Sequence, residues 1–465
     1  MPLRDYQELA KEQVRQHIRN GKRRICVVLP TGGGKSPIAA DIIKGALAKG
    51  NPSLFWVHRR SLVTQMADRL RSEGLAVGEI MAGCPTGPEA IQVASIQSLV
   101  RRDPPPARLI LVDECHRIRG AAQEKMLERY PDAVLIGFTA TPIRLDGRGL
   151  GTTFDAMVVA ATPRELIDAG WLADYEGYRY EAPDISGVKV SKGDYDEHGL
   201  SLAYEAPSVI GDVVGRYLAH ARGQQAILFA SSIDNSKAFV AAFIAAGVRA
   251  EHIDHHTPLS ERDAIMGRVR SGATELISNV GLCVEGVDYP GWRVAILARP
   301  SKSLTLYLQA VGRVLRPKPD GSKARIHDHA QLVATHGLPD IDRQWTLTID
   351  KQKQKPPALH TCKQCFAVWQ GVYKCPVCGW QPEVVQQLEE ARRLEVIDGA
   401  ELDIRSKTQV RRDELGTFEE LMRHARAAGR KPGWAIWKFK EKAPGAPLPW
   451  SVWRRYVDKE TKTWR

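Results

Sequence analysis

The sequence contains no run of about 18 consecutive apolar residues, the length that a membrane-spanning helix requires. Its first residues, MPLRDYQELAKEQ, include no apolar segment of the kind found in secretory signals. Short internal repeats are also absent. These absences argue against a membrane-spanning or secreted protein. We therefore expect a cytoplasmic protein, of a bacterium or of a phage-infected cell, with no membrane partner.

Cysteine is scarce, with eight residues in a chain of 465. Cys26, Cys84, Cys115 and Cys283 are scattered in apolar or motif contexts, which is typical of reduced thiols. The other four are clustered within residues 362–378, at a spacing typical of metal ligands. This distribution excludes the disulfide framework of a small secreted protein.

The composition is that of a globular protein, with 43% apolar and 26% charged residues. The length favours two or three domains. The net charge is +12, and residues 421–465 alone carry 12 basic and 3 acidic side chains. A basic balance of this kind favours a polyanionic partner, usually nucleic acid.

Apolar strands alternate with stretches of helical periodicity from residue 23 onward. This alternation predicts an α/β fold, with parallel sheets covered on both faces. The pattern weakens between about 160 and 210 and then resumes, which indicates a second α/β lobe. The expected parts are lobe 1 at 1–160, a linker at 161–210, lobe 2 at 211–349, a four-cysteine module at 356–382 and a charged, mostly helical region at 383–465. The expected strands are 25–29, 53–58, 90–95, 108–113, 133–139, 225–231, 273–280, 293–298 and 324–330.

The strongest local signal lies between the first expected strand and helix, and consists of Pro30, Thr31, Gly32, Gly33, Gly34, Lys35 and Ser36. Glycines let the backbone form a concave nest for phosphate oxygens, and a helix N-terminus adds positive partial charge. Lys35 would neutralise the β- and γ-phosphates of ATP, and Ser36 would bind Mg²⁺. Leu29 stands where the strict pattern has glycine. The alternative interpretation is a glycine-rich turn with an incidental lysine.

A second signal, Asp113-Glu114-Cys115-His116, follows the apolar strand at 108–113. The carboxyl end of a parallel strand lies beside the phosphate loop of the same sheet. Asp113 would hold Mg²⁺ through water, and Glu114 would polarise the attacking water. The alternative is a solvated cluster of charges at a strand end.

Taken in order, the motifs resemble those of superfamily 2 nucleic-acid helicases of the DExH type, over roughly residues 3–330. The resemblance implies that RDYQ (Arg4 to Gln7) contacts adenine, and that His116, Thr139, Thr141 and Gln309 couple hydrolysis to nucleic-acid binding. It places Gly286 and Asp288 near the nucleotide, with Asp288 near the ribose. It implies nucleic-acid contacts for the motif segments that contain His58, Arg59, Gln97, Ser98, Ser231 and Asn279.

Arg313 and Arg316 belong to the segment QAVGRVLR, which matches the family pattern QxxGRxxR. Charge accumulates on the γ-phosphate during phosphoryl transfer, and a guanidinium placed there stabilises it. Arginines three residues apart lie on one face of a helix. If lobe 2 supplies them, the site is complete only when the lobes close. Without the other motifs, an amphipathic basic helix would be the preferred interpretation.

Within the superfamily, the chain is most similar to the RadD/XPB-like bacterial and phage group, on LRDYQ, DECHR, TATPIRL, EGVDYP and the later cysteine cluster. The resemblance implies two tandem RecA-like lobes, ATP and Mg²⁺ as cofactors, DNA as the favoured polymer and 3′→5′ movement. RNA is the second candidate polymer, and replication or repair proteins are candidate partners. A third hypothesis is a nucleic-acid clamp that ATP switches without unwinding.

The four clustered cysteines, Cys362, Cys365, Cys375 and Cys378, form two CxxC knuckles separated by nine residues. Four thiolates can enclose a tetrahedral Zn²⁺ and leave no open position, so a structural zinc ribbon is predicted. Iron and a metal-free pair of redox motifs are the alternatives. The His-rich segment EHIDHH at 251–256 lacks a second ligand cluster, so we expect no metal there.

Five of the eleven tryptophans lie after residue 430, among lysines and arginines. Two interpretations are open for this tail. The tryptophans form the core of a small helical domain whose basic side chains remain free to touch phosphate, or their rings stack on bases.

Overall fold

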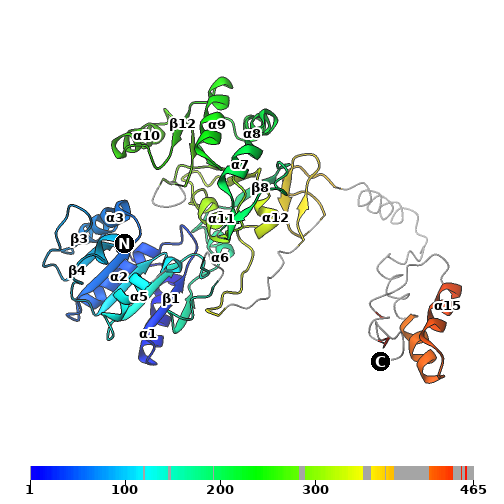
Figure 1. The fold of residues 1–465 in the computed structure, drawn as a ribbon, viewed down its shortest axis with the longest axis horizontal. Coiled ribbons are helices and arrows are strands. Elements are labelled where there is room, and N and C mark those ends of the chain that lie inside the picture. The colour runs from blue at the N-terminus through cyan, green and yellow to red at the C-terminus, as the bar shows by residue number, and fades with distance from the viewer. Residues whose placement is uncertain are drawn as a thin grey trace. The chain divides into compact units, whose positions relative to one another are not determined.

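The computed structural model describes residues 2–118, 121–144, 148–191, 193–281, 289–348, 358–371, 373–381, 418–442, 452 and 456–457. The chain divides into two compact units, Met1–Gln381 and Pro382–Arg465. Figure 1 shows the first unit in blue to yellow and the described part of the second in orange and red. Among the described helices, none has the length and apolar character needed to cross a bilayer.

The first lobe is built on a seven-stranded sheet in which every pairing is parallel. Its strands are β1 (Arg24–Val28), β2 (Ser53–Val57), β3 (Gly78–Ile80), β4 (Ile91–Ser95), β5 (Leu109–Asp113), β6 (Val134–Thr139) and β7 (Ala156–Val159). Their order in the sheet is β3-β4-β2-β5-β6-β1-β7. Strands β1, β2, β4 and β5 are buried along almost their whole length, as expected for a sheet covered by helices on both faces.

The second lobe is built on an eight-stranded sheet in the order β12-β13-β11-β14-β15-β8-β17-β16. Its strands are β8 (Tyr175–Arg179), β11 (Ala226–Ala230), β12 (Ala250–Ile253), β13 (Leu276–Asn279), β14 (Val294–Ala298), β15 (Ala324–Asp328), β16 (His360–Thr361) and β17 (Ala367–Trp369). The first six strands of this order pair in parallel, and the last two pair antiparallel. A separate two-stranded ladder joins β9 (Val190–Ser191) to β10 (Asp194–Tyr195).

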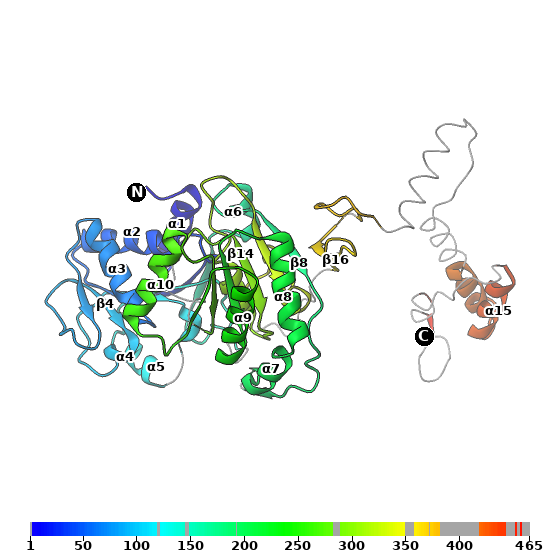
Figure 2. The same cartoon turned by 90° about the horizontal axis from the view of Figure 1, so that it is seen from above.

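Helices connect the strands and cover the sheets (Figure 2). In lobe 2, α8 packs against α9, and α9 lies on strands β11, β12 and β13. The helices of the first unit are α1 (Asp5–Arg19), α2 (Lys35–Leu47), α3 (Arg60–Ser72), α4 (Ile96–Leu99), η1 (Cys115–Arg117), α5 (Ala121–Glu128), α6 (Pro163–Asp168), α7 (Glu197–Tyr204), α8 (Pro207–His220), α9 (Ile233–Ala245), α10 (Leu259–Ser271), α11 (Leu304–Val311) and α12 (Leu332–His336).

The expected α/β class with two tandem RecA-like parallel-sheet lobes is confirmed. The segment 161–210, expected as a linker, has a different organisation. It contributes β8 to the interior of the second sheet, between β15 and β17, together with helices α6, α7 and most of the first turn of α8. Its sequence in β8, YEGYR, has no continuous apolar run. One neighbour of this strand is β17 of the cysteine module, and Tyr178 packs against His220 of α8.

The second unit has its own small apolar core. Residues 418–427 form one helix and α15 (Pro432–Lys442) forms another, with a turn at Gly429 between them. Their apolar faces meet in a cluster that includes Phe418, Met422, Ala435 and Phe439. The helical character that the sequence predicts for 383–465 is therefore present in 418–442, and residues 383–417 lie outside the described part.

Candidate nucleotide-binding site and metal centre

The glycine-rich loop joins the end of β1 to the first residue of α2, Lys35. Gly32 and Gly34 have φ values of 85° and 84°, in the left-handed region that only glycine adopts without strain. Gly34 is also the N-cap of α2, and a Cβ there would collide with the Gln7 amide. The loop is therefore a close-packed backbone turn at a helix N-terminus, the arrangement that binds phosphate.

Gln7 is buried against this loop. Its Nε2 donates to the carbonyl of Gly34 at 3.2 Å, and its Oε1 accepts from the Arg4 backbone N–H at 2.9 Å. The Arg4 guanidinium lies 4.0 Å from the centre of the Trp171 ring. Trp171 belongs to no motif, so sequence reasoning missed this contact. The N-terminal segment is thus hydrogen-bonded to the phosphate loop. The expected contact of Gln7 with adenine stays a prediction.

Lys35 and Glu114 form an ion pair, with Nζ 3.0 Å from Oε1. Burial alone would raise the pKa of Glu114, but the charge and hydrogen bond of Lys35, with the charges of His116 and Arg117, together outweigh it and lower the pKa to about 2. Burial likewise opposes the charge of Lys35, yet the Glu114 and Asp113 carboxylates raise its pKa. Both groups are therefore held charged. Glu114 also has φ 48°, a left-handed conformation that is strained for a side chain other than glycine.

A chain of polar contacts leads away from Glu114 through lobe 1. His116 Nδ1 lies 3.4 Å from Glu114 Oε2 and 2.9 Å from Thr139 Oγ1. Thr139 Oγ1 accepts from the Thr141 N–H at 3.0 Å, and Thr141 Oγ1 lies 2.7 Å from Thr305 Oγ1 on α11 of lobe 2. Burial lowers the pKa of His116 to about 4, so this imidazole is neutral at pH 7.

The two arginines of QAVGRVLR follow α11 and face the phosphate loop. A Cβ on Gly312 would lie 2.5 Å from Thr31 Cβ, and one on Gly32 would lie 3.9 Å from Arg316 Cγ. Arg313 is buried, and its charge acts on Lys35. Gln309 is buried as well. The structure therefore brings the segment of Arg313 and Arg316 against the phosphate loop of lobe 1, with glycine at the closest approach.

The expected nucleic-acid residues divide into two groups. In lobe 1, Gln97 is exposed and donates to the His58 carbonyl at 3.0 Å, and Arg59 reaches the Gly281 carbonyl of lobe 2 at 3.2 Å. Ser98 lies nearby, in the first turn of α4, where its N–H donates to the Ser95 side chain.

In lobe 2, Ser231 and Asn279 are fully buried. Ser231 donates to the Asn235 side chain, and Asn279 donates to the Leu228 carbonyl at 2.8 Å. These two side chains hold strand ends in place, and their contact with nucleic acid stays a prediction. Gly286 and Asp288 lie outside the described residues.

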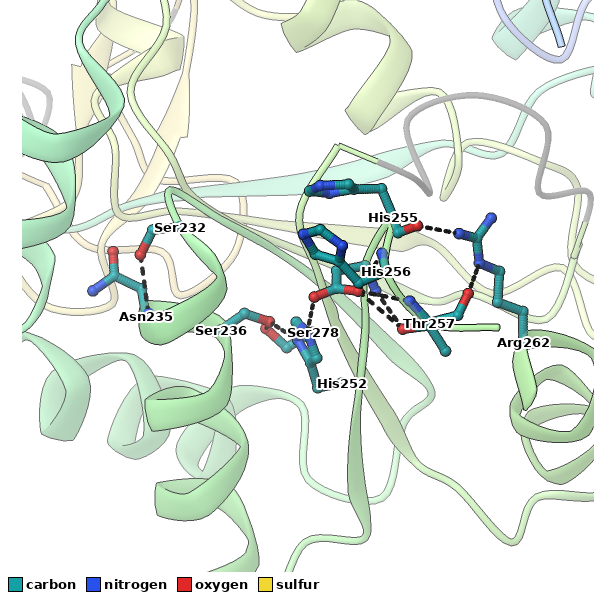
Figure 3. Close-up of polar contacts among 10 residues, drawn as sticks. Ser232, Asn235, Ser236, His252, His255, His256, Thr257, Arg262 and Ser278 are labelled. Atoms are coloured by element: carbon teal, nitrogen blue, oxygen red, sulfur yellow. Dashed lines mark hydrogen bonds and ion pairs between the residues drawn. The ribbon is translucent and has the colours of Figure 1, made fainter. Parts of the chain in front are cut away.

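The His-rich segment forms a hydrogen-bonded loop (Figure 3). The His252 ring joins Ser236 Oγ, at 2.6 Å, to the Asp254 carboxylate, at 3.0 Å. Asp254 also accepts from the backbone N–H groups of His256 and Thr257. His252 and Asp254 are thus engaged in fixing the loop after β12.

The four clustered cysteines converge on one point, with all four Sγ atoms within 4.8 Å of one another. The Cys362–Cys378 and Cys365–Cys375 sulfur pairs are 3.6 and 3.7 Å apart. Four thiolates around a tetrahedral Zn²⁺ with bonds of about 2.3 Å lie about 3.8 Å apart, so the cluster fits this ion. Among the described residues, this is the one group that could hold a metal ion.

The two knuckles share one backbone pattern. The N–H after each CxxC, from Phe366 and Gly379, donates to the carbonyl of the first cysteine at 3.0 Å. Phe366 and Gly379 both have positive φ, 64° and 75°. The knuckles are attached to lobe 2, because β17 pairs with β8 and the Arg216 guanidinium lies 4.1 Å from the Phe366 ring centre.

These features define the class of protein. A phosphate loop and an Asp-Glu pair on one RecA-like lobe, facing arginines of a second lobe, are the parts of an ATP-dependent helicase. Residues 1–144 match the family model described as "Type III restriction enzyme, res subunit". Residues 210–318 match the one described as "Helicase conserved C-terminal domain". The chain belongs to the superfamily 2 helicases, with which the resemblance of its motifs agrees.

Individual relatives support the same family. A 51.5 kDa protein of a Lactococcus phage is 35% identical, over 82% of this chain and 82% of its own length. IRC3 of Saccharomyces cerevisiae, provisionally named an ATP-dependent helicase, is 32% identical over 68% of this chain. This chain spans only 49% of IRC3. The DNA 3′-5′ translocase XPB2 of Sulfurisphaera tokodaii is 24% identical, over 68% of this chain and 79% of its own length.

Solved structures share the fold. The ATP-dependent Type ISP restriction-modification enzyme LlaBIII bound to DNA aligns with a TM-score of 0.52 at 15% identity, over 70% of this chain and 28% of the enzyme. A single-residue variant of Saccharomyces cerevisiae Dbp5, bound to RNA and ADP BeF3, aligns with a TM-score of 0.50 at 13% identity, over 69% of this chain and 83% of Dbp5. At these identities the likeness concerns the fold alone.

Proposed function

We propose that this helicase-family chain is a DNA-dependent motor that hydrolyses ATP between its lobes and moves along one strand in the 3′→5′ direction. The observation that carries the proposal is the Lys35–Glu114 ion pair, placed where the arginine-bearing segment of lobe 2 meets the phosphate loop. Relatives named as DNA 3′-5′ translocase or helicase, and the net charge of +12, favour DNA.

In this proposal, the residues of lobe 1 bind the nucleotide. The backbone of residues 31–34 holds the phosphates, Lys35 neutralises their charge, Ser36 and Asp113 hold Mg²⁺, and Gln7 with Arg4 contacts the base. The fit of the nucleotide phosphates to this loop rests on two glycines in the left-handed conformation before the helix and on a charged lysine. Bound Mg²⁺ would supply charge neutralisation at the phosphates.

Glu114 is proposed as the base. Its carboxylate accepts a proton as the water oxygen attacks the γ-phosphorus, while the bond from that phosphorus to the bridging oxygen breaks and ADP leaves. Arg313 and Arg316 stabilise the charge that develops on the γ-phosphate. Because they come from lobe 2, hydrolysis depends on the contact between the lobes.

For the cysteine module we propose a structural Zn²⁺. All four ligands are cysteines at distances that suit a closed tetrahedral site. The expected replication or repair proteins remain proposals as partners of the motor.

The test is ATP hydrolysis by the purified chain with no polymer, single-stranded DNA, duplex DNA and RNA in parallel, with Lys35→Ala as the control. We expect stimulation by single-stranded DNA that is lost in the control. Stimulation by RNA alone would refute the DNA assignment in favour of an RNA helicase. Stimulated hydrolysis with no strand separation and no movement along DNA would support the alternative hypothesis, a clamp that ATP switches without unwinding.

A further inference from the structure

Among its described residues, the second unit presents one large apolar side chain that is mainly exposed, and Trp450, Trp453 and Trp464 lie outside that part. Along α15, Ala435 and Phe439 are buried and Trp434 is half-buried in the core. Trp437 lies on another face of the helix and is 62% exposed. The expectation that tryptophans build this unit's core therefore holds for Trp434, whereas Trp437 contributes nothing to it.

The local sequence leaves the Trp437 ring open for contact. Side chains on a helix lean toward its N-terminus, over the residue four positions earlier. For Trp437 that residue is Gly433, which is exposed and has no side chain to cover the ring. Lys438 Nζ lies 5.3 Å from the centre of the ring and is also paired with Glu441 at 2.6 Å. The ring is thus a flat surface with a cation beside it.

Basic side chains outnumber acidic ones on the described part of the unit. Lys440, three residues after Trp437, shares its exposed face. Further exposed cations lie in the preceding helix and in the turn that leads into α15, namely Arg423, Arg426, Arg430 and Lys431. The exposed face of α15 that carries Trp437 and Lys440 is called the Trp437 surface below.

We propose that the Trp437 surface is a second nucleic-acid site that binds single strands, with one unpaired base stacked on the Trp437 ring and neighbouring phosphates held by the cations. A ring can stack in this way only on a base that is not already stacked within a duplex. The clustered positive charge complements phosphates and is screened by salt, as nucleic-acid contacts are. The identity of the polymer, DNA, rests on the proposed function.

Such a site gives the motor a contact with the nucleic-acid strand outside the two lobes. In the proposed function the lobes change their contact with the strand during the ATP cycle, whereas the second unit presents the ring on a core of its own. Two linked sites on one polymer raise overall affinity through effective concentration.

The experiment measures binding of the full-length chain to fluorescently labelled oligothymidylate and oligouridylate by anisotropy, without nucleotide and over a range of salt. Trp437→Ala is expected to weaken binding about tenfold, within the range measured for loss of one stacked base. Trp437→Phe keeps an aromatic face and should lie within about threefold of the unchanged chain. Lys440→Gln should reduce the slope of log K against log salt by about 0.7.

Lys49→Gln, an exposed lysine of lobe 1, is the matched control and should leave affinity and slope unchanged. Circular dichroism checks that Trp437→Ala remains folded, and quenching of tryptophan fluorescence by the oligonucleotide should be smaller in Trp437→Phe than in the unchanged chain. If all variants bind the oligonucleotides with equal affinity and equal quenching, this inference is wrong. An unchanged chain that binds neither polymer would overturn the proposed function itself.

Discussion

Loss of the proposed Zn²⁺ should weaken the second lobe as well as the cysteine module, because the module extends the sheet of that lobe. The perturbation is Cys375→Ser, which replaces one buried ligand, or removal of the metal by a chelator. Strand β17 pairs with β8, and Arg179 N–H donates to the Phe366 carbonyl at 3.0 Å. A module that unfolds without its metal would expose β8.

The expected loss in the free energy of unfolding follows from the side chains that would become exposed to solvent. Val368 and Trp369 are buried in β17, and full burial of a large apolar side chain contributes about 1.5–3 kcal/mol. The stacking of Arg216 on Phe366 adds about 0.5–1 kcal/mol. We therefore expect a loss of about 4 kcal/mol, which lowers the melting temperature of a lobe of this size by about 10 °C.

The assay combines three measurements on the full-length chain. Mass spectrometry should find one zinc per chain, and none in Cys375→Ser. Calorimetry should show the lower melting temperature, and hydrogen exchange should show faster exchange at β8. Cys84→Ser, at a cysteine outside the cluster, is the control and should change none of these. Unchanged exchange at β8 in a zinc-free chain would refute the reasoning.

Three further changes test the contact between the lobes and the buried ion pair. Gly312→Ala should lower kcat about 10- to 100-fold, because the added Cβ would lie 2.5 Å from Thr31 Cβ and push the lobes apart; steady-state ATPase kinetics measure this. Thr305→Val should leave hydrolysis without polymer in place but reduce its stimulation several-fold, because Thr141 loses its 2.7 Å partner. Since the pKa of Glu114 is lowered to about 2, its pairing with Lys35 stabilises the fold above pH 4.5, and about 3 kcal/mol should be lost between pH 4.5 and 2 in denaturant titrations.

Each of these changes has a matched control. Gly215→Ala is also a glycine replacement in lobe 2, on an exposed position of α8 with no atom within 4 Å, and should stabilise slightly. Thr335→Val removes an exposed hydroxyl that bonds only within its own helix. Glu114→Gln should flatten stability between pH 4.5 and 2. A normal kcat in Gly312→Ala, normal stimulation in Thr305→Val, or an undiminished pH slope in Glu114→Gln would contradict the respective arguments.

The sequence predicted the apolar strands in the parallel interior of both sheets and missed β7, AMVV, which is apolar but lies at a sheet edge. The runs at 108–113 and 293–298 become β5 and β14, which are central and covered on both faces. Other strands that sequence reasoning missed are of different kinds. β3, GEI, is a three-residue edge strand. β8, YEGYR, contains Glu176 and Arg179 and pairs with a module almost 190 residues later. Such pairing is set by tertiary packing and leaves no local pattern.

The same distinction applies to the site. The approach of Lys35 to Glu114 could be predicted, because the carboxyl ends of parallel strands meet at one edge of the sheet, and only β6 separates β1 from β5. The partners Trp171 and Thr305 could not be predicted, because an isolated tryptophan or threonine carries no spacing signal. Which residue of lobe 2 meets Thr141 depends on how the lobes pack together.

Helix α11 has contacts with lobe 1 at both of its ends. At its start, Thr305 meets Thr141, the last member of the polar chain that begins at Glu114. Just beyond its end, Gly312 packs on Thr31 of the phosphate loop. An eight-residue helix is a rigid body about 12 Å long, so it cannot lose one contact by tilting without straining the other. Opening of the lobes would therefore break both contacts of α11 together, the one to the polar chain from Glu114 and the one to the phosphate loop. The position of the arginines after α11 thus depends on both parts of the site.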